Sequence, residues 1–323
     1  MTTDSTIRNV AWYGTGNLGR PILQHLASTQ KFNITLLVRR EPASYDNLPS
    51  NITIKQIDIS KRSSLVDALA GNDATVVFTS MLPYNNMDGL QLELINASIA
   101  AGVKFFVPSE WGPDTAGGNG ATTFRIGPDT LPPTPIIAMK RAVHNYLLVR
   151  SAESKINFAT LHTGNMLLNV NVFASIDVQK RTALLPEGGR HLFSVTSQKT
   201  LGNALVNLLS RYPENKNTFH YICDGETSLH QIVLAVQKAS GSQEPWDISS
   251  FSLEENKRKA DANLKEGRMT LQEFFGVLGV PFTGPLTVWT NPDNRILGLE
   301  DPSSAKAQEI VDKVALSLLA QQS

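Results

Sequence analysis

The feature that most constrains the fold of this chain is a glycine-rich turn near its N-terminus. An apolar run over residues 10–13 leads into Gly14, Gly16 and Gly19 at G-x-G-x-x-G spacing, and an amphipathic segment over residues 18–26 follows. This order predicts a strand, a tight turn and a helix. Gly14 allows the positive φ that such a turn needs, Gly16 lets a pyrophosphate approach the backbone, and Gly19 lets the helix lie close to its strand.

A helix that starts directly after such a turn presents unpaired backbone N–H groups and the positive end of its dipole to a phosphate. Pro21 is compatible with this position, because the first helical turn tolerates a residue without an N–H group. The glycine pattern alone also occurs in ordinary turns, but the flanking strand and helix favour a dinucleotide site. The residues expected to line it are Gly14, Thr15, Gly16, Asn17, Leu18 and Gly19, with Arg20 as a further phosphate contact.

The end of the second predicted strand indicates which dinucleotide binds. The apolar segment 32–38 ends at Arg39 and Arg40, close to the expected spacing of ~20 residues beyond the first glycine. In NAD-binding units an acidic residue here holds the ribose hydroxyls, whereas arginine suits the additional phosphate of NADP. We therefore expect NADP(H) as the cofactor. Glu41 and a plain surface role for the two arginines keep NAD open as an alternative.

Apolar and amphipathic segments alternate through the first half of the chain. Strands are expected at residues 52–58, 74–79, 103–107 and 156–161, and helices at residues 61–69, 89–101 and 136–150. This repeat predicts an α/β fold with a doubly wound parallel Rossmann sheet and right-handed crossovers. Ligands of such sheets bind at the carboxyl ends of the strands, so Asp58, Ser80 and Met81 are expected to contact the cofactor.

The pattern changes after residue 160. Residues 181–185 and 191–195 flank a Pro-Glu-Gly-Gly turn and predict a β-hairpin. A helix at residues 197–209 and a strand at residues 218–223 are expected next.

Two domains are expected from this change. Residues 1–160 would form the NADP-binding Rossmann domain and residues 161–323 a second, smaller substrate-binding cap, with segments near 196–225 returning to the first domain. An amphipathic helix over residues 305–320 is expected to pack within the chain, with contact to a second subunit of a homodimer as the alternative.

Composition argues against several classes of function. The 29 basic and 29 acidic residues balance, so neither a nucleic-acid footprint nor a polybasic membrane signal is present. No segment approaches ~18 uninterrupted apolar residues, and the polar start lacks the apolar region of a secretory signal, so we expect a cytoplasmic protein without a membrane partner. The single cysteine, Cys223, suits a reducing compartment and lies in an apolar run expected to be core. The common motifs of hydrolases, P-loop proteins and zinc proteases are absent, and no metal site is expected.

A second motif, Pro108-Ser109-Glu110-Trp111-Gly112, follows the strand expected at residues 103–107. With the glycine turn, Val38-Arg39-Arg40 and Lys140 on the helix after the loop, it makes the chain resemble the NmrA-like or isoflavone reductase-like family of atypical short-chain dehydrogenases/reductases. The resemblance covers roughly the first half of the chain, and the loop is its most specific part.

The resemblance implies that Lys140 lies at the nicotinamide, where a lysine of that family replaces the tyrosine-centred machinery of ordinary short-chain dehydrogenases. An ammonium beside a substrate oxygen can donate a proton or stabilise developing negative charge while hydride arrives. Partial burial near Arg141 would lower the pKa of Lys140. The plain alternative is an exposed helix lysine. His162 is a secondary candidate for proton transfer, with a merely hydrogen-bonded ring as its alternative.

The remaining expected site residues surround this lysine. Ser109 and Glu110 are expected to contact the cofactor. The resemblance implies the same for Asn165, which follows the strand at residues 156–161 and matches an asparagine often found at this point in the family. An aromatic substrate is expected to be lined by Tyr84, Trp111, His144 and Met166.

Three functional hypotheses follow from these expectations. The first is an NADPH-dependent reductase of an aromatic or heterocyclic specialised metabolite, with Lys140 as proton donor or electrostatic stabiliser. The second is a regulatory protein, resembling the namesake of the NmrA-like family, that senses the redox state of NADP without catalysis. The third is a non-redox isomerase or cyclase on the same fold. Lys140 favours an enzyme, because the regulatory branch of the family does not need it.

Overall fold

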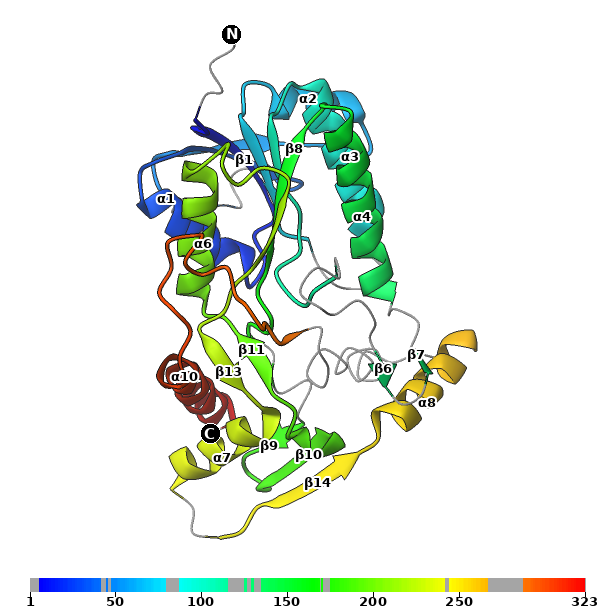
Figure 1. Ribbon diagram of the computed structural model, residues 1–323, viewed down its shortest axis with the longest axis vertical. Coiled ribbons are helices and arrows are strands. Elements are labelled where there is room, and N and C mark those ends of the chain that lie inside the picture. The colour runs from blue at the N-terminus through cyan, green and yellow to red at the C-terminus, as the bar shows by residue number, and fades with distance from the viewer. Residues whose placement is uncertain are drawn as a thin grey trace.

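The computed structural model describes residues 6–41, 45, 48–79, 87–115, 125–126, 129–130, 135–168, 170, 175–241, 244–266 and 287–322. Its centre is a parallel sheet of seven strands with helices on both faces (Figure 1). The strands, in spatial order, are β12 (Thr218–Tyr221), β8 (Asn157–His162), β5 (Phe105–Val107), β4 (Ala74–Val77), β1 (Asn9–Tyr13), β2 (Asn33–Val38) and β3 (Ile52–Gln56). All six neighbouring pairs are parallel, which confirms the predicted α/β fold class.

The central strands of the sheet are buried on both faces, as strands of parallel sheets covered by helices usually are. Every residue of β4 is buried, as are all but the first residues of β1 and β8. One face is covered by α1 (Gly19–Ser28) and α6 (Gln198–Ser210), and the other by α2 (Arg62–Leu69), α3 (Met87–Ala100) and α4 (Pro135–Ala152) (Figure 1). The order of the strands reverses between β1 and β4, and this reversal is where open α/β sheets bind ligands.

Two segments beyond residue 160 belong to the central sheet. α6 lies against α1, and β12 pairs with β8 as the last strand. The outer edge of β12 is in turn covered by residues near the end of the chain: Asp293 N–H donates to Tyr221 O, and Asn294 Nδ2 donates to Cys223 O at 2.8 Å. Cys223 is only 2% exposed, which confirms its expected place in the core. The division of the chain into two domains at residue 160 stays a prediction.

A second layer of structure lies beyond the carboxyl edge of the sheet. β10 (Thr182–Pro186) pairs in parallel with β14 (Asp247–Phe251) and antiparallel with β9 (Ile176–Asp177), while β11 (Phe193–Val195) pairs antiparallel with β13 (Gly225–Thr227). Two further short strands, β6 (Arg125–Ile126) and β7 (Asp129–Thr130), pair with each other, and α8 (Leu253–Lys265) follows β14.

The predicted hairpin over residues 181–195 is therefore wrong. β10 and β11 belong to different sheets, because the turn between them, η3 (Glu187–Gly189), bonds to other elements. Gly188 N–H donates to Ser250 Oγ at 2.8 Å, and the Glu187 carboxylate accepts from Leu253 N–H at 2.7 Å at the start of α8. These bonds tie the turn to β14 and α8.

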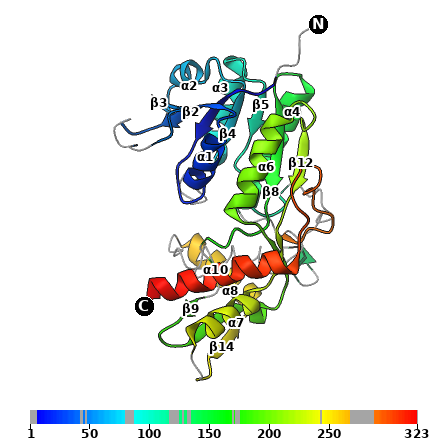
Figure 2. The ribbon, with the colours of Figure 1, turned by 90° about the vertical axis from the view of Figure 1, so that its left-hand side faces the viewer.

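A second apolar core lies between α7 (Leu229–Ser240) and α10 (Ser304–Gln322), which run side by side (Figure 2). α7 starts with a capping box of Ser228 and Gln231 and ends at Gly241, whose φ is 66°. Val311 and Leu318 of α10 are buried in this core. The helix predicted at residues 305–320 thus packs within its own chain, as expected.

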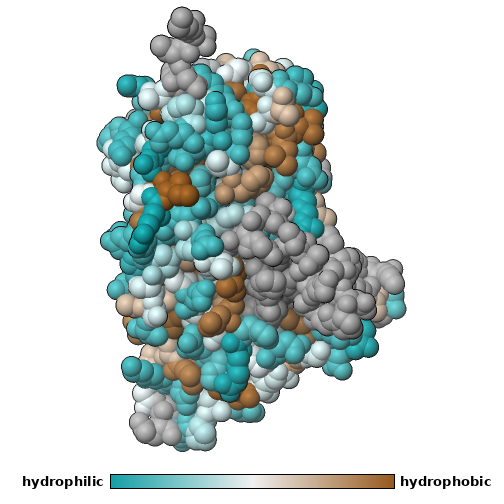
Figure 3. Space-filling view, viewed as in Figure 1, coloured by the Kyte–Doolittle hydropathy of each residue, from teal (hydrophilic) through white to brown (hydrophobic). Residues whose placement is uncertain are grey.

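The surface is mixed in character. Figure 3 shows mostly hydrophilic residues on one face of the molecule, interspersed with smaller apolar groups. Within the described ranges, no helix is both long enough and apolar enough to cross a bilayer.

Candidate cofactor and catalytic site

The glycine turn joins β1 to α1 at the point where the strand order reverses. Gly14 has a φ of 106°, and a Cβ on it would lie 1.9 Å from the carbonyl oxygen of Phe78, directly after β4. A Cβ on Gly19 would lie 2.4 Å from Gly14 O, whereas a Cβ on Gly16 would meet nothing within 4 Å. Packing within the chain therefore requires glycine at positions 14 and 19. Gly16 instead faces open space, so a ligand can approach its backbone.

The N-terminus of α1 faces the same space. The helix begins at Gly19, slightly later than expected, and neither a side-chain cap nor an acidic residue in the first turn compensates its N–H groups. Gly16 and Asn17 are exposed, and Thr15 and Leu18 are half-buried. An uncapped helix start with exposed backbone before it fits a phosphate group.

Arg39 and Arg40 are exposed directly after β2, the strand next to β1. Burial raises the pKa of the Tyr13 hydroxyl at the end of β1, and the charge of Arg39 opposes this rise, so the Arg39 guanidinium lies within electrostatic reach of that hydroxyl. The position of Asp58 gives less support to a contact with the cofactor. It follows the outermost strand, β3, and its carboxylate accepts from the Ser60 hydroxyl at 2.6 Å and pairs with Lys61 at 3.2 Å. Its contact with a cofactor stays a prediction.

Three aromatic rings stack beneath the turn. The Phe78 ring lies between Trp12 and Trp111, with centroid distances of 4.8 Å and 4.2 Å. Trp111 is 9% exposed, has a φ of 36°, and donates through Nε1 to Val77 O at 2.9 Å. The ring of Trp111 thus supports the carboxyl end of β4, and the expected stacking of a substrate on it stays a prediction.

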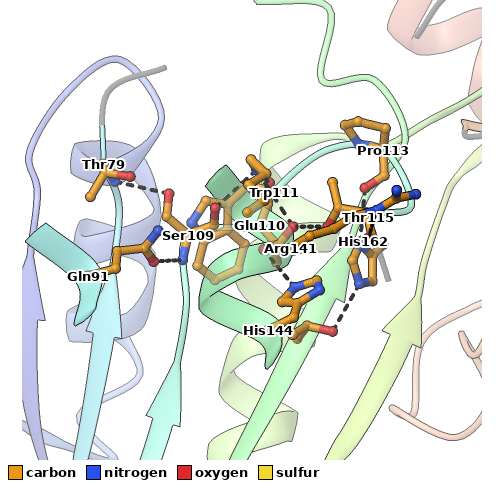
Figure 4. Close-up of polar contacts among 12 residues, drawn as sticks. Thr79, Gln91, Ser109, Glu110, Trp111, Pro113, Thr115, Arg141, His144 and His162 are labelled. Carbon is orange, nitrogen blue, oxygen red and sulfur yellow. Dashed lines mark hydrogen bonds and ion pairs between the residues drawn. The ribbon is translucent and has the colours of Figure 1, made fainter. Parts of the chain in front are cut away.

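Ser109 ties three elements together at the end of β5 (Figure 4). Its N–H donates to Gln91 Oε1 of α3 at 2.7 Å, and its Oγ accepts from the N–H of Thr79, after β4, at 3.0 Å. The carbonyl of Ser109 faces Lys140 of α4. Sequence reasoning missed Gln91, although a glutamine on the buried face of an apolar helix is itself a signal of a specific polar contact.

Lys140 is 3% exposed, which excludes the plain alternative of an exposed helix lysine. Its ammonium donates to the carbonyl oxygens of Ser109, at 3.0 Å, and of Glu110. The third N–H has no acceptor within hydrogen-bond distance among the described residues, and the nearest carboxylate atom, Glu110 Oε2, is 3.7 Å away. Burial lowers the pKa of Lys140 below its ordinary value, and the charge of Glu110 opposes this effect.

The expected influence of Arg141 on this lysine is wrong. The Arg141 guanidinium donates through Nε to Thr115 O at 3.0 Å and does not contribute to the pKa shift of Lys140. Neighbouring positions on a helix point in different directions, so the two cations are not brought together.

Glu110 and His144 lie against each other rather than toward open space. His144 Nε2 is 2.7 Å from Glu110 Oε1, and the Thr115 hydroxyl donates to Glu110 Oε2 at 2.6 Å (Figure 4). Burial alone would raise the pKa of Glu110, but the charges of His144 and Lys140 outweigh it and hold this pKa well below the ordinary range. Glu110 is thus a buried, ionised carboxylate. Its predicted contact with the cofactor and that of His144 with the substrate stay predictions.

His162 lies at the end of β8 and is fully buried. Burial lowers the pKa of its ring to about 4, so the ring is neutral at pH 7. Nδ1 then donates to Pro113 O and Nε2 accepts from the Thr160 hydroxyl, both at 3.0 Å. Both nitrogens are used within the chain, as in the hydrogen-bonded alternative, and a role in proton transfer stays a prediction that these contacts do not support.

Asn165 follows β8 at the same edge of the sheet. Its backbone bonds to Ser194 O and Thr196 N–H, and its side-chain Nδ2 is buried without an acceptor among the described residues. A buried, unpaired amide donor is costly unless a ligand satisfies it. Together with the open space at Gly16, it fits a bound dinucleotide. Met166 packs against the main core, and Ser80, Met81 and Tyr84 lie outside the described residues.

The sheet, the glycine turn and the uncapped helix start define a Rossmann-type dinucleotide-binding protein. The chain belongs to the NmrA-like family, whose model matches residues 10–275. This assignment confirms the resemblance found in the sequence.

The chain is also similar to two curated proteins and, in its fold, to a solved structure. The chain is 28% identical over 266 residues to oxidoreductase aprR of Aspergillus flavus, covering 82% of this chain and 84% of the relative. It is 26% identical over 310 residues to oxidoreductase poxI of Penicillium oxalicum, covering 93% and 91%. The crystal structure of the Escherichia coli NADPH-dependent quinone oxidoreductase QOR2 with NADPH matches with a TM-score of 0.68 at 19% identity, covering 96% of this chain and 99% of that one.

Proposed function

We propose that this protein is an NADPH-dependent reductase that transfers hydride to an aromatic or heterocyclic specialised metabolite, with Lys140 as the proton donor or electrostatic stabiliser. The observation that carries the proposal is the buried ammonium of Lys140, which keeps one N–H without an acceptor among the described residues at the carboxyl edge of the sheet. Both curated relatives are named oxidoreductases, and QOR2 is an NADPH-dependent one, which supports the reaction class and the cofactor.

The binding of the cofactor is assigned to residues at the carboxyl ends of the strands. Gly16 and the N-terminus of α1 would hold the pyrophosphate, Arg39 and Arg40 the additional phosphate of NADP, and Asn165 Nδ2 would donate to an acceptor on the cofactor. When bound, NADPH supplies the hydride.

Lys140 would act on the other half of the reaction. Its third N–H would donate to the substrate oxygen that gains negative charge as hydride arrives, and the proton would follow to give the neutral product. Solvent then restores the ammonium. The lowered pKa of Lys140 helps this transfer, because a weaker base releases its proton more readily.

The test is the loss of NADPH absorbance with a panel of phenylpropanoid-type and polyketide-type acceptors. Lys140→Ala should retain NADPH binding and lower kcat by about 10²- to 10⁴-fold, the usual contribution of a general acid. Lys155→Ala, which changes an exposed lysine just beyond the same helix, is the matched control and should keep full activity. Full turnover by Lys140→Ala would remove the mechanism.

The same experiment separates the two alternative functions. NADPH binding without oxidation by any acceptor would favour a redox-sensing regulatory protein. Product formation without net consumption of NADPH would favour an isomerase or cyclase. The proposal also includes a cytoplasmic location and a small-molecule substrate, and light scattering tests the predicted homodimer.

A further inference from the structure

A buried group of charged side chains surrounds Lys140, and the proposed reaction does not use all of it. Lys140 and His144 lie one helical turn apart on α4, and both face the carboxylate of Glu110 in the loop after β5. The three residues are 3%, 3% and 1% exposed. We propose that Glu110 and His144 are positioning residues for Lys140, an inference that rests on the proposed role of this lysine. His144 holds the Glu110 carboxylate, and the carboxylate keeps Lys140 protonated and in place.

The geometry gives each carboxylate oxygen its own partner. Oε1 lies 2.7 Å from His144 Nε2, while Oε2 accepts from the Thr115 hydroxyl at 2.6 Å and lies 3.7 Å from Lys140 Nζ. A rotation of the carboxylate would break the contacts on both sides at once. The position of the negative charge relative to the ammonium is therefore fixed by two elements, α4 and the loop at residues 108–115.

The ring of His144 is oriented by aromatic packing. The rings of His162 and Phe219 meet it edge to face, at centroid distances of 5.8 Å and 5.4 Å. These contacts hold the ring with Nε2 2.7 Å from Glu110 Oε1, and neither ring nitrogen has a partner with hydrogen-bond geometry among the described residues. The approach of Nε2 to Glu110 Oε1 is thus the closest polar contact of the His144 ring among the described residues.

Glu110 supplies the formal negative charge that offsets the Lys140 ammonium. The carbonyls of Ser109 and Glu110 accept hydrogen bonds from Lys140 but carry no net charge. A buried ammonium without a counter-charge is expensive and tends to lose its proton. The other ionisable groups at this site are committed elsewhere: His162 is neutral, and Asp114 accepts from the Tyr221 hydroxyl at 3.1 Å and lies by His162.

The substitution Glu110→Gln removes the charge and keeps the size of the side chain. Lys140 should then lose its proton at a pH at least one unit lower than in the wild type. The upper limb of the pH profile for NADPH oxidation should move down with it, with the rate recovering toward low pH. Glu153→Gln, an exposed carboxylate at the end of the same helix, is the matched control and should shift neither value.

The decisive readout is NMR titration of isotopically labelled lysine in the protein without substrate, with the Lys140 signal assigned through Lys140→Arg. This readout needs no turnover, so an absence of reductase activity would refute the proposed function without deciding the positioning role. An unchanged Lys140 titration in Glu110→Gln, or an equal loss of activity at every pH, would overturn the inference. Should this variant fail to fold, His144→Gln takes the same test. His144→Gln should lower the midpoint of the Lys140 titration, because the Glu110 carboxylate is no longer held in position by the His144 ring. An unchanged midpoint would count against the proposal.

Discussion

Two substitutions in the glycine turn, at positions 14 and 16, should affect different properties of the protein: its stability and its binding of NADPH. Gly14→Ala is expected to destabilise the fold, because its Cβ would lie 1.9 Å from Phe78 O. Gly16→Ala is expected to leave the fold intact and to weaken the binding of NADPH, because its Cβ meets no protein atom within 4 Å. The pair separates the role of the turn in folding from its role in binding.

The size of the first effect follows from the surroundings of Phe78. Its backbone N–H donates to Tyr13 O at 2.7 Å, and its ring is held between Trp12 and Trp111, so its carbonyl cannot withdraw freely. Overpacking of this kind costs about 1–3 kcal/mol. A φ of 106° adds strain of about 1–3 kcal/mol for a residue with a Cβ. Because the entropy of unfolding is about 2.1 cal/mol/K per residue, a loss of about 3 kcal/mol would lower the Tm of this 323-residue chain by roughly 4 °C.

For Gly16→Ala, thermal unfolding should show a change in stability within about 0.5 kcal/mol. Calorimetric titration should show the Kd for NADPH raised by about tenfold or more, which corresponds to about 1.4 kcal/mol. Binding of NADPH by Gly16→Ala with the wild-type Kd would refute the placement of the pyrophosphate on this turn. A wild-type Tm for Gly14→Ala would refute the packing argument.

Three further predictions concern single side chains. Arg39→Ser should raise the Kd for NADPH by about tenfold or more and leave that for NADH unchanged, as measured by titration calorimetry, since a charge-assisted bond to the additional phosphate is worth about 1.5–3 kcal/mol; equal losses for both cofactors would contradict it. Burial lowers the pKa of His162 from 6.5 to about 4, so the unfolded chain binds a proton that the folded one rejects, and the free energy of unfolding should fall as the pH drops through this range. Urea unfolding at several pH values should show a weaker dependence of the free energy of unfolding on pH in His162→Gln. An unchanged dependence would mean that other groups cause it. Burial raises the pKa of the Cys223 thiol to about 12, so a thiol reagent should react with it only after denaturation, and rapid reaction of the native protein would be inconsistent with this burial.

The central sheet was predictable because its strands carry their own local signal. β4 and β5 are short apolar runs that parallel sheets bury on both faces, and the helices between them alternate with these runs. The error at the predicted hairpin has the opposite cause. The actual partner of β10 is β14, a mostly exposed and polar strand far along the chain, and nothing local marks it as a neighbour.

The candidate site was predictable in its parts but not in its contacts. The sequence pointed to Lys140, Glu110 and His144 separately, and the spacing of Lys140 and His144 on one helix was visible. The missing information was the direction of that helix face. Packing of α4 against the loop after β5 turns it toward Glu110, and only the tertiary structure shows this.

The late closure of the central sheet has a consequence for the protein as it is synthesised. β8 remains an open edge until Thr218–Tyr221 have left the ribosome, and β12 remains open until Asp293 and Asn294 follow. Unpaired strand edges are templates for aggregation. A nascent chain that stops before residue 218 thus exposes β8, and a fragment cut at residue 160 lacks the end strand of its own sheet. The chain can complete its central sheet only when nearly all of it has been made.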